Sequence, residues 1–138
     1  MTERFEVLEH TADVGLRARA PTREEVFEAL GEGLATLQGA WFPDGGTERD
    51  VEVEAPDQAA LLVSWLDELL YLHETEDAVF TGLAVDRVDD TTLSARVRLS
   101  PRGDRELEGV GVKAATYHRV KVAREPGGGW NAQVYLDV

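Results

Sequence analysis

The chain has 138 residues, of which 43% are hydrophobic and 30% charged, values typical of one soluble globular domain that buries roughly 68–70% of its unfolded surface. The absence of cysteine excludes disulfides, thiolate metal sites and thiol catalysis, and a formal net charge of −13 opposes binding to phosphate backbones. No apolar signal region opens the sequence and no run approaches the ~20 apolar residues of a membrane span, so we expect a cytoplasmic protein without membrane contact.

Hydrophobic periodicity predicts the element order β-β-α-β-α-β-β-β-β. The expected strands, in chain order, cover residues 4–9, 14–20, 47–54, 79–88, 91–100, 110–123 and 130–137. Asp89-Asp90 is expected to form a tight hairpin turn, and residues 126–129 a looser one. This order predicts an α+β fold in which residues 1–138 form a single domain, with two main helices packed on antiparallel sheet structure.

Both helices have recognisable starts. Thr22 precedes the first helix as a capping residue with Glu25 three positions later, and Gly39 is expected to end that helix. Gly31 and Gly33 should each weaken it by up to ~1 kcal/mol relative to alanine. The second helix should run from the N-cap Asp57 to about residue 74, with its leucines and Trp65 forming a broad buried face. Ser64, Asp67, Glu68 and Tyr71 fall largely on its other side.

Two aspartates at opposite ends of the chain are the first candidates for function. Asp13 lies in the polar segment 9–15 between the first two strands, and Asp137 precedes Val138, where the chain stops. If the two terminal strands are neighbours, the two side chains and the terminal carboxylate converge, and such a cluster either repels itself or holds a cation. An Asx or Ser/Thr turn, in which Thr11 and Asp13 bond their own backbone, is the structural alternative for this segment.

The range 110–124 contains no acid but includes Lys113, His118, Arg119, Lys121 and Arg124. This basic segment could meet a phosphate or an acidic protein surface, or it could be the polar face of a strand that balances acids elsewhere. Autonomous nucleic-acid binding is not expected, because no aromatic platform or nucleic-acid motif accompanies it.

The remaining candidates assemble no reaction mechanism. Serines occur only at positions 64, 94 and 100, and none lies in a nucleophile-elbow motif. No glycine-rich segment has the lysine of a phosphate loop. Among the histidines, His10 is the most informative, since its place beside Asp13 suits an indirect supporting role or a pH-sensitive neighbour of a metal site.

Four stretches in order resemble the archease family. They cover residues 9–15, 64–76, 112–118 and 130–138 and read EHTADVG, SWLDELLYLHETE, VKAATYH and WNAQVYLDV. By this resemblance the protein is a non-enzymatic cofactor of RtcB-type RNA ligases that promotes guanylylation and multiple turnover in tRNA splicing and RNA repair. The resemblance also implies a metal site, usually of calcium, formed by Asp13, Asp137 and the main-chain oxygen of Val138.

We therefore expect an acidic tip that binds a hard divalent cation, Ca²⁺ or Mg²⁺, and enters the pocket of an RtcB-type ligase. His10, Lys113 and His118 are candidates for contact with phosphate or the partner. The alternative is a chaperone-like modulator of a tRNA-modifying enzyme such as a methyltransferase, acting through the acidic surface and the helices. A third hypothesis, a metal-dependent hydrolase, would require phosphoester turnover by the isolated protein.

Overall fold

The computed structural model describes residues 4–9 and 13–138. Its elements are β1 (Phe5–Glu9), β2 (Asp13–Ala20), α1 (Arg23–Leu37), β3 (Thr47–Glu54), α2 (Gln58–Thr75), β4 (Ala78–Val88), β5 (Thr92–Pro101), β6 (Ala114–Arg124) and β7 (Trp130–Asp137). The predicted order of two helices and seven strands is confirmed, as is the α+β class.

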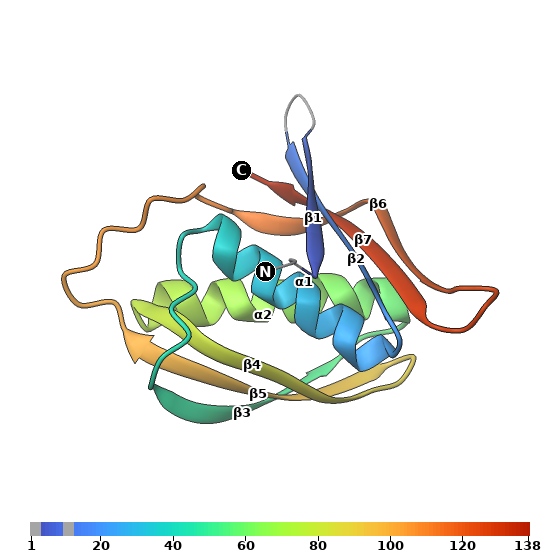
Figure 1. The fold of residues 1–138 in the computed structure, drawn as a ribbon, viewed down its shortest axis with the longest axis horizontal. Coiled ribbons are helices and arrows are strands. Elements are labelled where there is room, and N and C mark those ends of the chain that lie inside the picture. Colours follow the sequence, from blue (N-terminus) through green and yellow to red (C-terminus); the bar gives the residue numbers. More distant parts are fainter. Residues whose placement is uncertain (1–3, 10–12) are drawn as a thin grey trace.

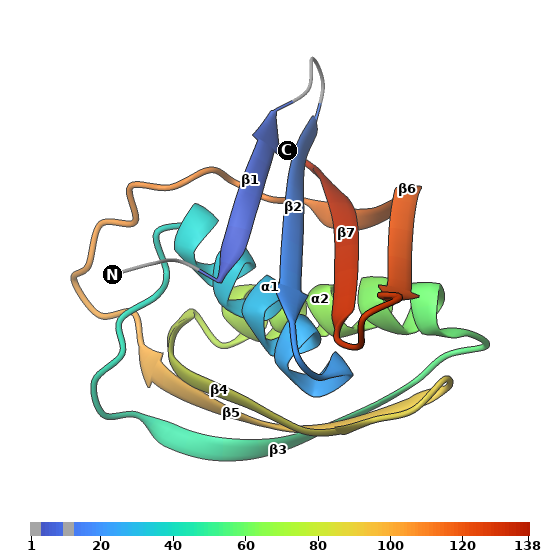
Figure 2. The same ribbon diagram turned by 45° about the vertical axis from the view of Figure 1, so that its right-hand side comes forward.

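The fold has three layers, with the two helices between two sheets (Figure 1). One sheet has the strand order β1-β2-β7-β6 and the other the order β3-β5-β4, and all pairs of these strands are antiparallel. Each helix contacts strands of both sheets, so the core is continuous from one sheet to the other. Figure 2 shows β1 and β2 extending beyond the helices, with the C-terminal end of β7 beside them.

The helices form where capping and burial agree. The Thr22 hydroxyl oxygen accepts a hydrogen bond from the Glu25 backbone N–H at 3.1 Å, and the Asp57 carboxylate accepts one from Ala60 at 2.8 Å. The predicted apolar face of α2 is buried, including Trp65, which is fully inaccessible and donates its indole N–H to the Phe27 carbonyl at 2.9 Å. Within the part of the chain that the structure describes, no helix is long and apolar enough to cross a membrane.

The two glycines inside α1 mark its closest contacts. A Cβ atom at Gly31 would lie 3.1 Å from Leu69 of α2, and one at Gly33 would lie 2.9 Å from the ring of Phe5 in β1. Distances below 3.4 Å are tighter than ordinary van der Waals contact, so side chains at these positions would push the helix away from its neighbours. The glycines therefore allow close packing between the helix and both partners.

The predicted strand over 110–123 starts too early. Residues 110–113 lie outside β6, because the Val110 N–H donates to the Leu37 carbonyl at the C-terminal end of α1 (2.9 Å) and so holds the chain on the helix. Gly109 fits there because it has no side chain, since a Cβ would overlap the backbone of Gln38. Alternation of side chains could not reveal this helix contact.

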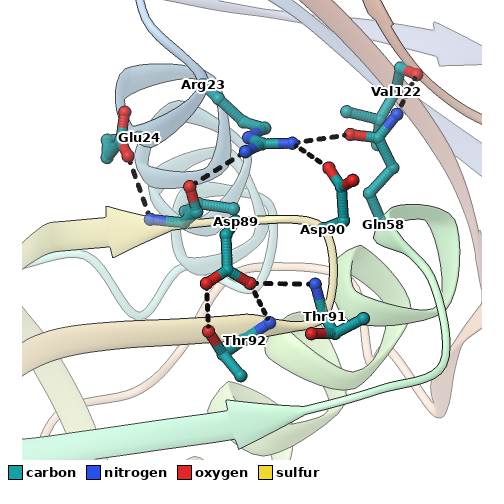
Figure 3. Close-up of polar contacts among 9 residues, drawn as sticks. Arg23, Glu24, Gln58, Asp89, Asp90, Thr91, Thr92 and Val122 are labelled. Atoms are coloured by element: carbon teal, nitrogen blue, oxygen red, sulfur yellow. Dashed lines mark hydrogen bonds and ion pairs between the residues drawn. The ribbon is translucent and has the colours of Figure 1, made fainter.

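Arg23, at the start of α1, joins the two sheets (Figure 3). Its guanidinium donates to Gln58 Oε1 at 3.0 Å, to Asp90 Oδ1 at 2.8 Å and to the Val88 carbonyl at 3.1 Å. Gln58 in turn donates to the Val122 carbonyl of β6 at 3.1 Å. The chain of bonds thus runs from the β4–β5 hairpin through both helix starts to the four-stranded sheet.

The predicted Asp89-Asp90 turn is confirmed. The Asp89 carboxylate accepts hydrogen bonds from the Thr91 and Thr92 backbone N–H groups and from the Thr92 hydroxyl, at 3.0, 2.8 and 2.8 Å (Figure 3). These donors favour the ionised carboxylate and lower the pKa of Asp89, the Thr91 N–H contributing most. The turn is therefore closed by its own first aspartate.

Candidate functional site

The structure places Asp13 directly opposite Asp137. They are the first residue of β2 and the last of β7, and they are register partners in the antiparallel pair of these strands. Side chains of directly opposed residues project from the same face, with Cβ atoms about 4.5–5.5 Å apart. Asp13 is half-buried and Asp137 exposed. The sequence-based condition for a shared site, that the two terminal strands are neighbours, is therefore met.

The donor chemistry of this pair fits a hard divalent cation. Like charges placed directly opposite on neighbouring strands repel, and a bound cation removes that repulsion. Both side chains offer carboxylate oxygens, the ligands that Ca²⁺ and Mg²⁺ prefer, and the main chain of Val138 follows immediately. Within residues 4–9 and 13–138, no group of three or more His, Cys, Asp or Glu side chains is placed to hold a metal ion. A cation here would thus have two carboxylates and complete its shell with main-chain oxygen and water.

Asp67 of α2 anchors the strand beside this pair. Its carboxylate accepts a hydrogen bond from the Ala115 N–H at 2.9 Å, and the neighbouring Ala114 is the register partner of Asp137. Burial raises the pKa of Asp67 above its ordinary value of 3.8, although the bond from Ala115 acts in the opposite direction. The expectation that Asp67 belongs to the polar side of the helix missed this role, because no sequence pattern links the helix to residue 115.

An aromatic contact covers the face next to the two aspartates. Gly15 is the register partner of Tyr135, and a Cβ at Gly15 would lie 2.8 Å from Cε1 of the tyrosine ring, so the ring lies over the glycine. His118 meets Tyr135 edge to face, with ring centroids 5.7 Å apart and an interplanar angle of 63°. Tyr135 is buried. Gly15 and Tyr135, which belong to the stretches 9–15 and 130–138 noted in the sequence, therefore pack together.

Two of the three candidate partner-contacting residues, Lys113 and His118, lie within the described part of the chain. Lys113 is exposed and its N–H donates to the Asp137 carbonyl at 2.8 Å, which places it next to the tip. His118 is exposed and its ring contacts that of Tyr135, which is two positions before Asp137 in β7. His10 lies outside the described residues.

The basic segment is not one continuous strand face. Between Thr116 and Lys121 the register of β6 against β7 shifts, and Arg119 has a φ of +53°, so the intervening residues bulge from the ladder. Lys121 returns to the ladder opposite Gln133. The bulge, which includes His118, separates Lys113 on the side of the tip from Lys121, which lies opposite the middle of β7.

Three comparisons agree on the relatives of this chain. Residues 5–138 match the model of the Archease protein family. The chain is 38% identical over 143 residues to Protein archease of Thermococcus kodakarensis, covering 98% of this chain and 99% of the relative, and 32% identical over 142 residues to that of Methanosarcina barkeri, covering 99% and 97%. The solution structure of Methanobacterium thermoautotrophicum protein 1598 matches with a TM-score of 0.78 and 30% identity, covering 99% of this chain and all of that one.

Proposed function

The chain belongs to the archease family, and on that premise we propose that it is a non-enzymatic activator of an RtcB-type RNA ligase. In this role it promotes the GTP-dependent guanylylation of the ligase and its repeated turnover in tRNA splicing and RNA repair. The pairing of Asp13 with Asp137 is the observation that carries the proposal, because it brings two carboxylates from opposite ends of the chain to one point.

The position of this point suits insertion into a partner. In both views β1, β2 and the end of β7 extend beyond the helices (Figures 1 and 2). We therefore propose that this tip enters the nucleotide pocket of the ligase. When bound there, a divalent cation would supply positive charge for the phosphates of GTP. Asp13, Asp137 and the main-chain oxygen of Val138 would hold the cation, while Lys113 and His118 would face phosphate or the ligase.

Single-turnover guanylylation of a cognate ligase tests the proposal. Asp13→Asn and Asp137→Asn each remove one of two carboxylates while keeping the size of the side chain, so each should lose most of the stimulation. Asp50→Asn is the matched control, because Asp50 is an exposed acid on β3 of the other sheet. Thermal unfolding without added metal verifies that all three variants fold. Full stimulation by both tip variants would refute the proposal.

A second candidate is a chaperone-like modulator of a tRNA-modifying enzyme such as a methyltransferase. The exposed acids of β3, Glu48, Asp50, Glu52 and Glu54, favour it because they offer a binding surface that needs no metal. A chelator distinguishes the two candidates. Activation of the ligase through the tip should stop in chelator, whereas binding through the acidic strand should persist in chelator and fall with Asp50→Asn.

A further inference from the structure

The open face of the four-stranded sheet carries a second polar site, away from the two aspartates. It is a solvent-open pocket of about 530 Å³, within the range of small-ligand sites. Four of its nine lining residues are cationic and one is acidic, although acids outnumber bases by 27 to 14 in the whole chain. The lining residues are Arg4, Phe5, Glu6, Arg17, Ala18, Arg19, Lys121, Asn131 and Gln133.

The strand register explains why these cations gather. Arg17 of β2 and Lys121 of β6 are both register partners of Gln133 in the central strand β7, so the three residues form one row across the sheet. Neighbouring strands lie about 4.8 Å apart, which puts the two cationic residues roughly 10 Å apart at the backbone with an amide side chain between them. Gln133 Nε2 donates to the Arg119 carbonyl at 3.1 Å, which fixes the side chain and leaves the second N–H of the amide.

Arg17 and Lys121 are the cations available to a ligand. Arg4 pairs with Glu28 and Glu32, at 3.1 and 2.5 Å, and Arg19 pairs with Glu125 at 2.9 Å. Arg17 and Lys121 are exposed, and no ion pair among the described residues engages either one. Glu6, the register partner of Arg17, offsets one charge at the rim.

We propose that this pocket binds one phosphate group of a phosphate ester, held between Arg17 and Lys121 over Gln133 and Asn131. A guanidinium fork, an ammonium group and amide N–H donors are the groups that recognise phosphate oxygens. The site is distinct from the tip, because Arg17 lies four residues from Asp13 along β2, about 13–14 Å at strand spacing. The proposal is independent of ligase activation.

A phosphate suits the pocket better than an acidic protein surface does. Protein interfaces are centred on buried aromatic and apolar anchors. The exposed large hydrophobic residues within the described part of the chain are Val7, Tyr71, Val110, Tyr117 and Val138, and none of them lines the pocket. A small polyanion needs charge and donors in a concave site, which is what the row provides.

The other sheet supplies an internal contrast. Its outer face has a pocket lined by Asp50, Glu52 and Asp86 with Val51, Ser94 and Ala95, so the charges there are acidic. Phosphate would be repelled by the lining of that pocket and attracted by that of the first. Binding should therefore be confined to the four-stranded sheet, which makes residues of the three-stranded sheet suitable controls.

The test is an amide-resonance titration of the full chain, at low ionic strength, with inorganic phosphate, GMP and a short single-stranded RNA. We expect phosphate and GMP to shift the resonances of 17–19, 121 and 131–133 saturably. Arg17→Gln and Lys121→Gln should each weaken binding roughly tenfold or more, since each removes a charge-assisted contact. Arg98→Gln, which removes an exposed arginine from the other sheet, should not.

The three ligands separate the sources of phosphate. Equal affinity for phosphate and GMP assigns recognition to the phosphate alone, while tighter binding of GMP places the nucleoside in the pocket as well. Tighter binding of RNA that remains sensitive to Arg17→Gln places one phosphate of the backbone there. The proposal is wrong if none of the three saturates, if binding survives the double variant of Arg17 and Lys121, or if Arg98→Gln weakens it equally.

Discussion

Replacing Asp67 with alanine tests whether helix α2 positions the strand beside the two aspartates. The change leaves the Ala115 N–H, now bonded to the Asp67 carboxylate at 2.9 Å in a partly buried place, without its acceptor. An unsatisfied donor of this kind costs about 1–3 kcal/mol of unfolding free energy. For a chain of this length that lowers Tm by roughly 4 °C per kcal/mol.

Urea unfolding at pH 7 measures this cost, and two further variants interpret it. Asp67→Asn keeps an oxygen acceptor for Ala115 and should restore most of the lost stability. Glu68→Ala removes a half-buried acid one position along the same helix, for which the described residues provide no hydrogen bond, and should cost less than about 0.5 kcal/mol. A loss in Asp67→Ala no greater than that in Glu68→Ala would refute the anchoring role.

The pH dependence gives an independent check on Asp67. Because burial raises its pKa in the folded state above 3.8, the folded protein binds the proton more readily than the unfolded chain does. The resulting stabilisation is fully present below pH 3.8 and is lost as pH rises through the folded-state pKa. The stability of the wild type relative to Asp67→Asn should therefore fall as pH increases through that interval, and a rise would contradict the argument.

Three further changes have clear expected results. Arg23→Met leaves the partly buried acceptors of the guanidinium without a donor, so urea unfolding should show a free energy of unfolding lower by about 2–4 kcal/mol. A loss below about 0.5 kcal/mol would show that these hydrogen bonds across the layers are dispensable. Gly109→Ala forces a Cβ into the Gln38 backbone and should lower the unfolding free energy by about 1–3 kcal/mol, whereas the Cβ of Gly111→Ala meets nothing within 4 Å and serves as the control. Equal Tm values for the two variants would refute the packing argument. If the tip binds Ca²⁺ with a Kd of about 1 mM, 10 mM Ca²⁺ should raise the unfolding free energy of the wild type by about 1.4 kcal/mol, and Asp13→Asn should lose that gain. An equal gain in the wild type and the variant would mean that the ion binds elsewhere.

The sequence was sufficient for the order and type of the elements. Local signals determine these features: the cap residues Thr22 and Asp57, the leucine-rich face of α2, and alternation in β3 and β7, whose bounds the prediction matched. The main error, the early start of β6, has a non-local cause. Val110 bonds to the end of α1, and a contact between segments more than seventy residues apart leaves no periodic signal.

The candidate site was predictable in composition but not in geometry. The sequence identified Asp13 and Asp137 as a pair only on the condition that their strands are neighbours, and alternation is silent on which strands pair. Asp67 was hidden because a polar residue on a helix is ordinarily solvated. The row of Arg17, Gln133 and Lys121 was hidden as well, since Arg17 and Lys121 are brought to one row by the register of two different strands with β7.

The register that joins Asp13 to Asp137 is determined by packing away from them. Slipping β2 by one residue against β7 would turn buried Leu16 out of the core, so a one-residue error is strongly disfavoured. A two-residue slip would keep Leu16 in the core, so the choice between these registers depends on packing at the outer face of the sheet. The Tyr135 ring lies where any side chain at position 15 would be, so the tyrosine fits opposite Gly15 and not opposite a residue with a side chain in the same place. The glycine thus favours the register in which the two carboxylates face each other, and the geometry of the tip depends on a packing contact two residues away from them.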